Sequence, residues 1–348
     1  MTTPRDPLDR ATGALLGTFV GDALGMPFEG KPAAAIPAQL EMEEARLGRG
    51  TYTDDTQMMI ALAESLLERG EVDEEHLAGA FLEAFDPDRG YGSGTMELFE
   101  FWRQGMPVTD AASRLYGGQG SLGNGAAMRI APIAVRFAAS DDRLRTQAER
   151  SSRLTHTHPL AIDAAVVQAV AIAAAFRGED IVAAGHGVAT TPVMHDQLSQ
   201  AEQLRGRPLT PDDIGVQLGN SPEGHQSVPT AMLAASSQPS FEQAVRFAVA
   251  CGGDSDTIGA MAGAIAGARD GASGMPPRWL DALENGSKGR RYVERLAVAL
   301  LADRENDKPR STWAPRKRSR AATKPHGVRR CAPALRVLGP GDRIAETR

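Results

Sequence analysis

The chain has 348 residues, 42% of them hydrophobic and 5% aromatic, a composition typical of a globular protein rich in small side chains. Its net charge of −6 hides an asymmetry, because residues 304–348 contain thirteen Lys or Arg and four Asp or Glu, a balance of +9. The rest therefore carries −15, which argues against a specific nucleic-acid-binding fold and leaves only non-specific contacts to the basic end.

The cysteines and the apolar segments indicate the compartment. Cys251 and Cys331 form no zinc-binding spacing and fit a reducing compartment without disulfides. The N-terminus has no apolar segment of the kind that signal peptides carry. Asp163 and Gln168 interrupt the most apolar stretch, 161–176, so we predict a core helix there and not a membrane span. We expect a cytoplasmic protein that does not bind a membrane.

The first predicted helix covers residues 8–24. Three of its glycines recur at four-residue spacing and would let a second helix approach closely: Gly13, Gly17 and Gly21. Pro27 and the glycines around it then end the helix in a loop that carries Glu29. No helix there uses the charge of Glu29, which slightly favours a functional or mobile role, although a solvated loop acid remains the first interpretation of such a residue. Residues 31–49 are predicted to be irregular at first, with a short helix around 40–47.

The next stretch, Thr53-Asp54-Asp55, stands at the start of a helix predicted over residues 54–69. One carboxylate at a helix N-terminus is ordinary capping. Two adjacent carboxylates raise each other's pKa, and a divalent cation relieves that conflict because it binds both. This cluster alone fits either a capped helix start or part of a metal site.

Further helices are predicted over residues 74–85, 96–103 and 108–115. Residues 116–125 follow with five glycines and run into a helix predicted from Ala126. Such a loop presents unpaired backbone N–H groups that can cradle a phosphate. Its pattern matches neither the P-loop nor the dinucleotide-binding fingerprint, so the motif alone is a weak signal.

Two histidines, His156 and His158, lie between helices predicted over residues 141–154 and 160–177. Their i, i+2 spacing differs from the i, i+4 spacing of helical zinc ligands, so we do not predict a histidine metal site. A hydrogen-bonded cap is the ordinary role of a histidine at a helix start. More helices are predicted within residues 181–216 and over residues 225–235 and 241–250.

A second acidic cluster, Asp254-Ser255-Asp256-Thr257, follows a glycine pair and opens a helix that continues to Ala268. Taken alone, it too fits a capped helix start. Two acidic, hydroxyl-bearing helix starts far apart in the sequence are what one shared metal site with oxygen ligands requires. The two clusters together therefore favour a metal site.

The end of the chain completes the predicted fold. Pro276-Pro277 starts a short helix that reaches Leu283, and a last helix covers residues 289–302. No stretch shows the alternating pattern of a strand bounded by hairpin turns. We predict an all-α fold in a single catalytic domain, 1–304. The tail, 305–348, is rich in Pro, Arg and Lys and is predicted to be disordered.

The order of five motifs resembles that of the ADP-ribosylglycohydrolase family over about residues 8–304. The motifs are Gly21-Asp22-Ala23-Leu24-Gly25 with Glu29 behind it, Tyr52-Thr53-Asp54-Asp55-Thr56, Ser121-Leu122-Gly123-Asn124-Gly125 with Met128-Arg129, Thr155-His156, and Gly252-Gly253-Asp254-Ser255-Asp256-Thr257. The family includes the enzyme that reactivates nitrogenase reductase by removing ADP-ribose from arginine. The resemblance implies an all-helical fold with two Mg²⁺ or Mn²⁺ ions between helix ends.

Matching positions carry the implied roles over to this chain. The metal ligands would be Thr53, Asp54, Asp55, Asp254, Asp256 and Thr257. Glu29 would match an acid on a mobile loop near the scissile bond, and Asp54 and Asp55 would also act in catalysis. ADP-ribose would be held by Ser121, Leu122, Gly123, Asn124, Gly125 and His156. Asp86 or Asp88 would loosely match a further acid near the metals.

The implied activity is that of a metal-dependent hydrolase that cleaves the glycosidic bond between ADP-ribose and an arginine or serine side chain, or a small conjugate. The transition state at ribose C1″ is oxocarbenium-like. Two metals would orient ribose hydroxyls and a water, while Glu29 would be the general acid or base. The partner would be an ADP-ribosylated protein or an ADP-ribose conjugate, and the enzyme would be a monomer.

Two alternative functions fit the same scaffold. A metal-dependent phosphoesterase would use the same carboxylates but would release AMP from ADP-ribose. A non-catalytic ADP-ribose-binding or lens-crystallin-like relative would keep the fold and lose metal ligands. The intact acids of both clusters argue against this second alternative.

Removal of residues 305–348 is expected to leave turnover of a small ADP-ribosyl substrate nearly unchanged. The tail lacks the apolar periodicity with which a segment buries surface and becomes ordered. Turnover rates and thermal melts of the full and shortened chains are the measurements. A large fall in activity, or a cooperative loss of stability, would show that the tail belongs to the folded domain.

Overall fold

The structure is a computed structural model that describes residues 6–306, and this range holds sixteen α-helices, four short 3₁₀ helices and no β-strand. Two isolated backbone bridges join loops, one between Pro32 and Gly252 and one between Gly123 and Glu223. The predicted all-α class is confirmed. Of the predicted tail, only its first two residues are described, as the end of the last helix, and the remainder lies outside the described residues.

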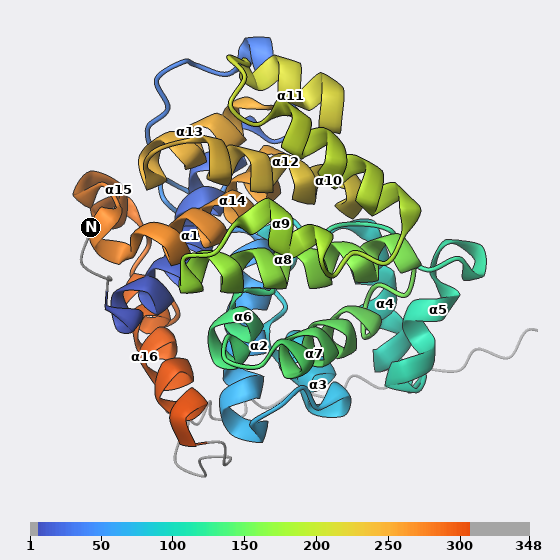
Figure 1. Cartoon of the computed structure of the whole chain (residues 1–348). Coiled ribbons are helices and arrows are strands. Elements are labelled where there is room, and N and C mark those ends of the chain that lie inside the picture. Colours follow the sequence, from blue (N-terminus) through green and yellow to red (C-terminus); the bar gives the residue numbers. More distant parts are fainter. Residues whose placement is uncertain (1–5, 307–348) are drawn as a thin grey trace, which may run out of the picture. The chain divides into compact units, whose positions relative to one another are not determined.

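Helices α1 (Pro7–Gly25) and α14 (Ser255–Asp270) lie side by side, antiparallel, at the centre of the described fold (Figure 1). Their glycines face each other, as the four-residue spacing predicted. A Cβ on Gly17 would lie 2.0 Å from the carbonyl oxygen of Gly263, so only glycine permits this approach. The C-terminal end of α1 is thereby brought beside the N-terminal end of α14.

The other helices pack around this pair. In chain order they are α2 (Asp54–Arg69), α3 (Glu74–Ala84), α4 (Ser93–Arg103), α5 (Val108–Gly118), α6 (Ala131–Phe137), α7 (Asp141–Arg153), α8 (Pro159–Arg177), α9 (Ile181–His186), α10 (Pro192–Leu204), α11 (Pro211–Leu218), α12 (Gly224–Ser237), α13 (Phe241–Ala250), α15 (Pro277–Ala282) and α16 (Arg290–Asn306). Helix α8 is long and apolar enough to cross a membrane, but 89% of its apolar window is buried in the fold. It is therefore the core helix that the sequence predicted.

The short helix predicted around residues 40–47 is wrong, because residues 36–53 form no helix. Glu41 explains the difference, since its carboxylate binds α13 and α15. It accepts hydrogen bonds from three side chains, Arg246 at 2.7 Å, Arg278 at 3.0 Å and Trp279 at 2.8 Å. The bond from Arg278 is the main reason that the pKa of Glu41 is lowered. These contacts hold the segment to neighbouring helices as a loop.

Helix α6 begins at Ala131, five residues after the predicted start at Ala126. Pro132 has no backbone N–H and fits only the first turn of a helix. In addition, the guanidinium of Arg129 donates to the carbonyl oxygen of Gly125 at 2.7 Å, an oxygen that a helix would pair with a backbone N–H. The residues before α6 therefore form turns instead.

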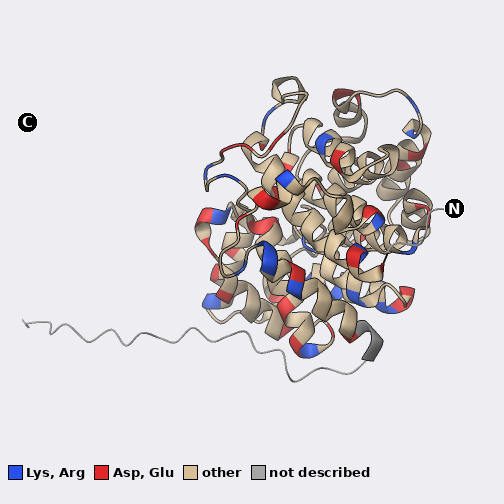
Figure 2. Ribbon diagram, turned by 90° about the vertical axis from the view of Figure 1, so that its left-hand side faces the viewer, with Lys and Arg blue, Asp and Glu red and all other residues tan. Residues whose placement is uncertain are grey.

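Figure 2 colours the ribbon by charge, and along the described helices positions of Lys and Arg are interspersed with positions of Asp and Glu. Residues 1–303 carry the acidic balance of −15, and the described helices belong almost entirely to this part of the chain.

Candidate functional site

The N-termini of α2 and α14 meet, as the two acidic clusters predicted. Thr53 is the N-cap residue of α2 and Asp55 lies in its first turn, while Asp256 and Thr257 lie in the first turn of α14. The Thr257 hydroxyl donates to the Asp55 carboxylate at 3.4 Å, and the Thr53 hydroxyl donates to the same oxygen at 3.1 Å. Residues 202 positions apart in the sequence therefore share one site.

Glu29 joins this site from the loop that follows α1. One carboxylate oxygen from each of Glu29, Asp254 and Asp256 lies within 4.8 Å of the others. The loop is held there by backbone bonds, because Gly30 N–H donates to the Gly253 carbonyl at 2.8 Å and Gly253 N–H donates to the Lys31 carbonyl at 2.9 Å. Glu29 itself is exposed and lines an open cavity of about 420 Å³.

Helix capping does not account for these acids. The Thr53 hydroxyl already caps α2 by accepting from Asp55 N–H. Asp254 occupies the N-cap position of α14 but makes no capping hydrogen bond. The Asp55 Oδ1 atom is buried with no hydrogen-bond partner in the described structure, which costs roughly 1–3 kcal/mol unless another group satisfies it. An oxygen-binding cation is such a group.

The electrostatics of the cluster also favour a cation. Burial, together with the charges of neighbouring carboxylates, raises the pKa of Asp54 to about 8 and that of Asp254 to about 6. The same causes raise the pKa of Asp55 and Asp256 well above the usual value. A set of carboxylate and hydroxyl oxygens suits hard divalent cations such as Mg²⁺ or Mn²⁺. The residues present therefore fit the metal centre that the resemblance implies.

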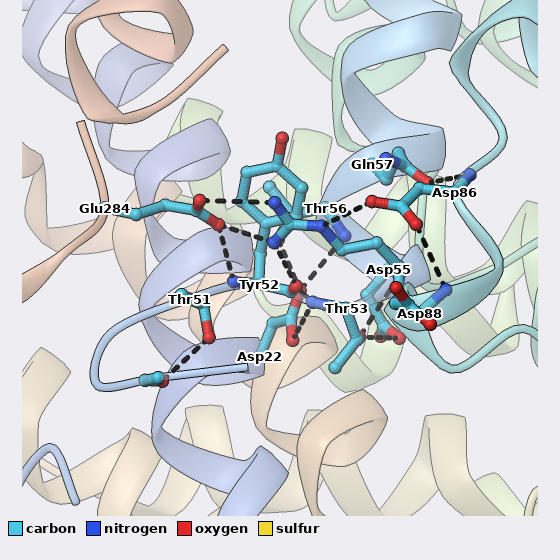
Figure 3. Close-up of polar contacts among 12 residues, drawn as sticks. Asp22, Thr51, Tyr52, Thr53, Asp55, Thr56, Gln57, Asp86, Asp88 and Glu284 are labelled. Carbon is cyan, nitrogen blue, oxygen red and sulfur yellow. Dashed lines mark hydrogen bonds and ion pairs between the residues drawn. The ribbon is translucent and has the colours of Figure 1, made fainter. Parts of the chain in front are cut away.

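Asp22 supports the first half of the site, a role that the sequence did not reveal. It is fully buried on α1, and burial raises its pKa to about 6. Thr53 N–H donates to both of its oxygens at 3.0 Å, and Thr56 donates to it from N–H at 3.1 Å and from its hydroxyl at 2.6 Å (Figure 3). Asp22 therefore holds the start of α2, whereas the sequence marked it only as a member of the motif at residues 21–25 without a role.

A second support holds the residue before Thr53. The Arg89 guanidinium stacks over the Tyr52 ring at 3.9 Å and donates to the Tyr52 carbonyl and to Glu284, each at 2.6 Å (Figure 3). Tyr52 N–H donates to Glu284 at 3.0 Å. The chain entering α2 is therefore fixed from both sides.

The two loop acids that were loosely matched to the metals lie in the short helix η3 (Pro87–Arg89) and its cap. The Asp86 carboxylate caps this helix by accepting from Asp88 N–H at 3.1 Å. Among the described residues the group of carboxylates within 4.8 Å of one another holds only Glu29, Asp254 and Asp256, so these two acids lie outside it, as Asp54 and Asp55 also do. Asp86 therefore has a structural role in this loop.

The glycine-rich loop is paired with the segment before α12. Asn124 N–H donates to the Pro222 carbonyl at 2.8 Å, and Gly224 N–H donates to the Leu122 carbonyl at 3.1 Å. Ser121 accepts from Gly123 N–H at 3.2 Å. Of the residues predicted to hold ADP-ribose, five lie in this loop: Ser121, Leu122, Gly123, Asn124 and Gly125.

His156 lies against this loop from the other side. A Cβ on Gly125 would lie 2.9 Å from the His156 ring, so the glycine lets the ring approach. Burial lowers the pKa of His156 to about 3, so the ring is neutral at physiological pH. It can therefore offer hydrogen bonds to a ligand but no charge.

Arg129 fixes both the loop and the histidine, although its motif carried no predicted role. Its buried guanidinium donates to the Gly125 carbonyl at 2.7 Å and to the Thr155 hydroxyl at 2.7 Å. That hydroxyl is hydrogen-bonded to His156 Nδ1 at 2.7 Å. Burial lowers the pKa of Arg129 to about 9. Hydrogen bonds through Arg129 thus connect the loop to the histidine.

Comparison with known proteins agrees with this arrangement. The family model for ADP-ribosylglycohydrolase matches residues 3–310. ADP-ribosylhydrolase ARH3 of Homo sapiens is 30% identical over 326 residues, which covers 80% of this chain and 90% of that protein. ADP-ribosylarginine hydrolase Tri1 of Pseudomonas putida is 27% identical over 319 residues, 86% of this chain and 80% of that protein.

A solved structure gives the same result at the level of the fold. It is described as an ADP-ribosylglycohydrolase-related protein complex and is 32% identical, with a TM-score of 0.72. The match covers 86% of this chain and 99% of that one. With a family model that spans nearly the whole sequence, this chain belongs to the ADP-ribosylglycohydrolase family.

Proposed function

We propose that this protein is a Mg²⁺- or Mn²⁺-dependent hydrolase that releases ADP-ribose by cleaving its glycosidic bond to an arginine or serine side chain or to a small conjugate. The observation that carries the proposal is the meeting of Glu29, Asp254 and Asp256 within 4.8 Å, beside a glycine-rich loop. The name of the Pseudomonas putida relative specifies ADP-ribosylarginine, which supports arginine-linked ADP-ribose as one substrate to test.

The cations would be held by the oxygens of two helix starts, from Thr53, Asp54, Asp55, Asp254, Asp256 and Thr257. Bound Mg²⁺ or Mn²⁺ would orient the ribose hydroxyls and lower the pKa of a water molecule. Glu29 is exposed beside these acids and is the group free to move a proton as the bond at ribose C1″ breaks.

The glycine-rich loop supplies binding of a different kind. The N–H groups of Gly123 and Asn124 are bonded within the protein, so the other backbone N–H groups of residues 121–125 and the Ser121 hydroxyl would take the diphosphate. Oriented dipoles of this kind stabilise an anion without a lysine. His156 adds a neutral hydrogen-bonding group at the loop. The loop thus binds the part of the substrate that does not react, while the acidic cluster surrounds the ribose.

Exhaustive chelation is expected to abolish turnover, and added Mg²⁺ or Mn²⁺ is expected to restore it, because the acidic site offers only oxygen ligands. Defined arginine-, serine- and O-acetyl-linked ADP-ribose substrates, with chromatographic analysis of products, provide the measurement. Full turnover after chelation would contradict metal dependence. Release of AMP in place of ADP-ribose would favour the phosphoesterase alternative.

A further inference from the structure

Asn124 is the residue of the glycine-rich loop that is hydrogen-bonded to the acidic cluster. Its side chain is buried, and Nδ2 donates to Asp254 Oδ2 at 2.6 Å and to Ser227 Oγ at 3.0 Å. The Ser227 hydroxyl donates its own proton to the Glu223 carbonyl oxygen at 3.2 Å. Both partners of the amide are therefore acceptors, so the nitrogen and not the oxygen of the Asn124 amide must face them.

The backbones around this bond are tied together as well. Asn124 N–H donates to the Pro222 carbonyl, and Asp254 N–H donates to the Asn220 carbonyl, each at 2.8 Å. The segment 220–222 thus holds the main chains of both residues, and the amide–carboxylate bond closes the ring. Asp254 makes no capping bond in α14, and its carboxylate is hydrogen-bonded by the Asn124 amide at 2.6 Å as well as by the side chains of Thr257 and Asp256. Of these three, Asn124 is the only one that reaches it from outside the acidic helix start, so the amide ties the direction of this carboxylate to the glycine-rich loop.

We propose that Asn124 is a positioning residue for the metal centre and that it orients Asp254, whereas the family resemblance implies a contact with ADP-ribose. The inference rests on the proposed metal centre. Both protons of the Nδ2 group are used within the protein, which leaves that group no proton for a ligand. Outer partners of this kind hold metal ligands in the binding orientation. A shift of the glycine-rich loop on binding ADP-ribose would therefore alter the affinity for metal. By the same thermodynamic linkage, bound metal would alter the affinity for ADP-ribose.

The test measures Mn²⁺ affinity of the full chain without substrate, by electron paramagnetic resonance of free Mn²⁺. Asn124→Ala is expected to weaken Mn²⁺ binding by about 10–100-fold, the usual cost of losing an outer partner of a metal ligand. Asn285→Ala is the matched control, because it removes an asparagine side chain that accepts from Arg291 N–H and belongs to neither the glycine-rich loop nor the acidic cluster. Its Mn²⁺ affinity should equal that of the wild type.

Each outcome decides between the two roles. Wild-type Mn²⁺ affinity in Asn124→Ala, with a loss of ADP-ribose affinity at saturating Mn²⁺, would overturn the inference and make Asn124 a ligand contact. If circular dichroism shows that this variant does not fold, Asn124→Leu replaces it, since a side chain of similar size that cannot donate removes the bond to Asp254. Weaker Mn²⁺ binding would then support the inference, and unchanged binding would overturn it. Absence of Mn²⁺ binding in the wild type would instead contradict the proposed metal centre, and with it the inference that depends on it.

Discussion

Asp256→Ala is expected to abolish metal binding and to lower turnover by at least about 10³-fold. A bound cation supplies several kcal/mol of transition-state stabilisation, and each 1.36 kcal/mol corresponds to a factor of ten in rate. The Asp256 carboxylate is buried in the first turn of α14, within the acidic group that includes Glu29 and Asp254. Asp254→Ala should act in the same direction, because it removes another oxygen ligand.

The fold of the Asp256→Ala variant should survive, which separates a metal ligand from a structural acid. Burial and neighbouring carboxylates raise the pKa of Asp256, so without metal its removal relieves repulsion. The metal-free variant should therefore melt at or above the temperature of the metal-free wild type, and added Mn²⁺ should no longer stabilise it.

Calorimetric titration with Mn²⁺ and thermal melts with and without the ion are the measurements. Asp212→Ala is the matched control, because Asp212 is the second residue of α11, as Asp256 is of α14, but is not part of the acidic group. It should bind Mn²⁺ as the wild type does. Wild-type affinity in Asp256→Ala would show that the metal site lies elsewhere.

The helices with strong local signals could be predicted from the sequence to within a residue. Helix α2 begins after the cap Thr53 and ends at Gly70, which has the positive φ of 78° that favours glycine. Helix α13 follows the cap Ser240, whose hydroxyl accepts from Gln243 N–H. Where caps, apolar periodicity and glycines agree, local chemistry determines the boundary without reference to the rest of the chain.

The wrong boundaries have two kinds of cause. The helix predicted around residues 40–47 does not form, because Glu41 binds Arg246 and Arg278 more than two hundred positions away. No local pattern announces such partners, because these bonds depend on how the helices pack. The late start of α6 has a local cause, since Pro132 fits only the first turn of a helix and the Arg129 guanidinium bonds to Gly125 four positions earlier.

In the candidate site, too, some residues could be predicted from the sequence and others could not. The sequence could predict that the two acidic clusters form one site, because adjacent carboxylates at a helix start repel each other unless a cation binds them. The residues that hold these clusters in place could not be predicted, because they are distant in the sequence. Asp22 accepts a hydrogen bond from Thr53, 31 positions away, and Asn124 donates one to Asp254, 130 positions away. The sequence thus indicated which residues carry charge, and the structure adds which residues hold them in place.

Glu29→Gln is expected to lower kcat by roughly 10²–10⁴-fold, the range for loss of a positioned acid or base. ADP-ribose affinity should change little, because binding of the product does not depend on that proton. Glu29 is exposed on a loop, and the nearest cation in sequence, Lys31, lies 5.1 Å from the centre of the Phe28 ring. No ion pair among the described residues involves Glu29, so its charge remains available to the reaction.

Single-turnover kinetics and ADP-ribose titration would separate chemistry from binding in this variant. Glu44→Gln is the control, because it removes an acid from the wall of the same cavity without touching the acidic group. It should stay within a few-fold of the wild type. If kcat of Glu29→Gln stays within a few-fold while ADP-ribose binding collapses, Glu29 clamps the ligand. The proton must then move elsewhere, and since Asp22 accepts four donated bonds and Asp86 caps η3, Asp54 and Asp55 would be the first groups to test.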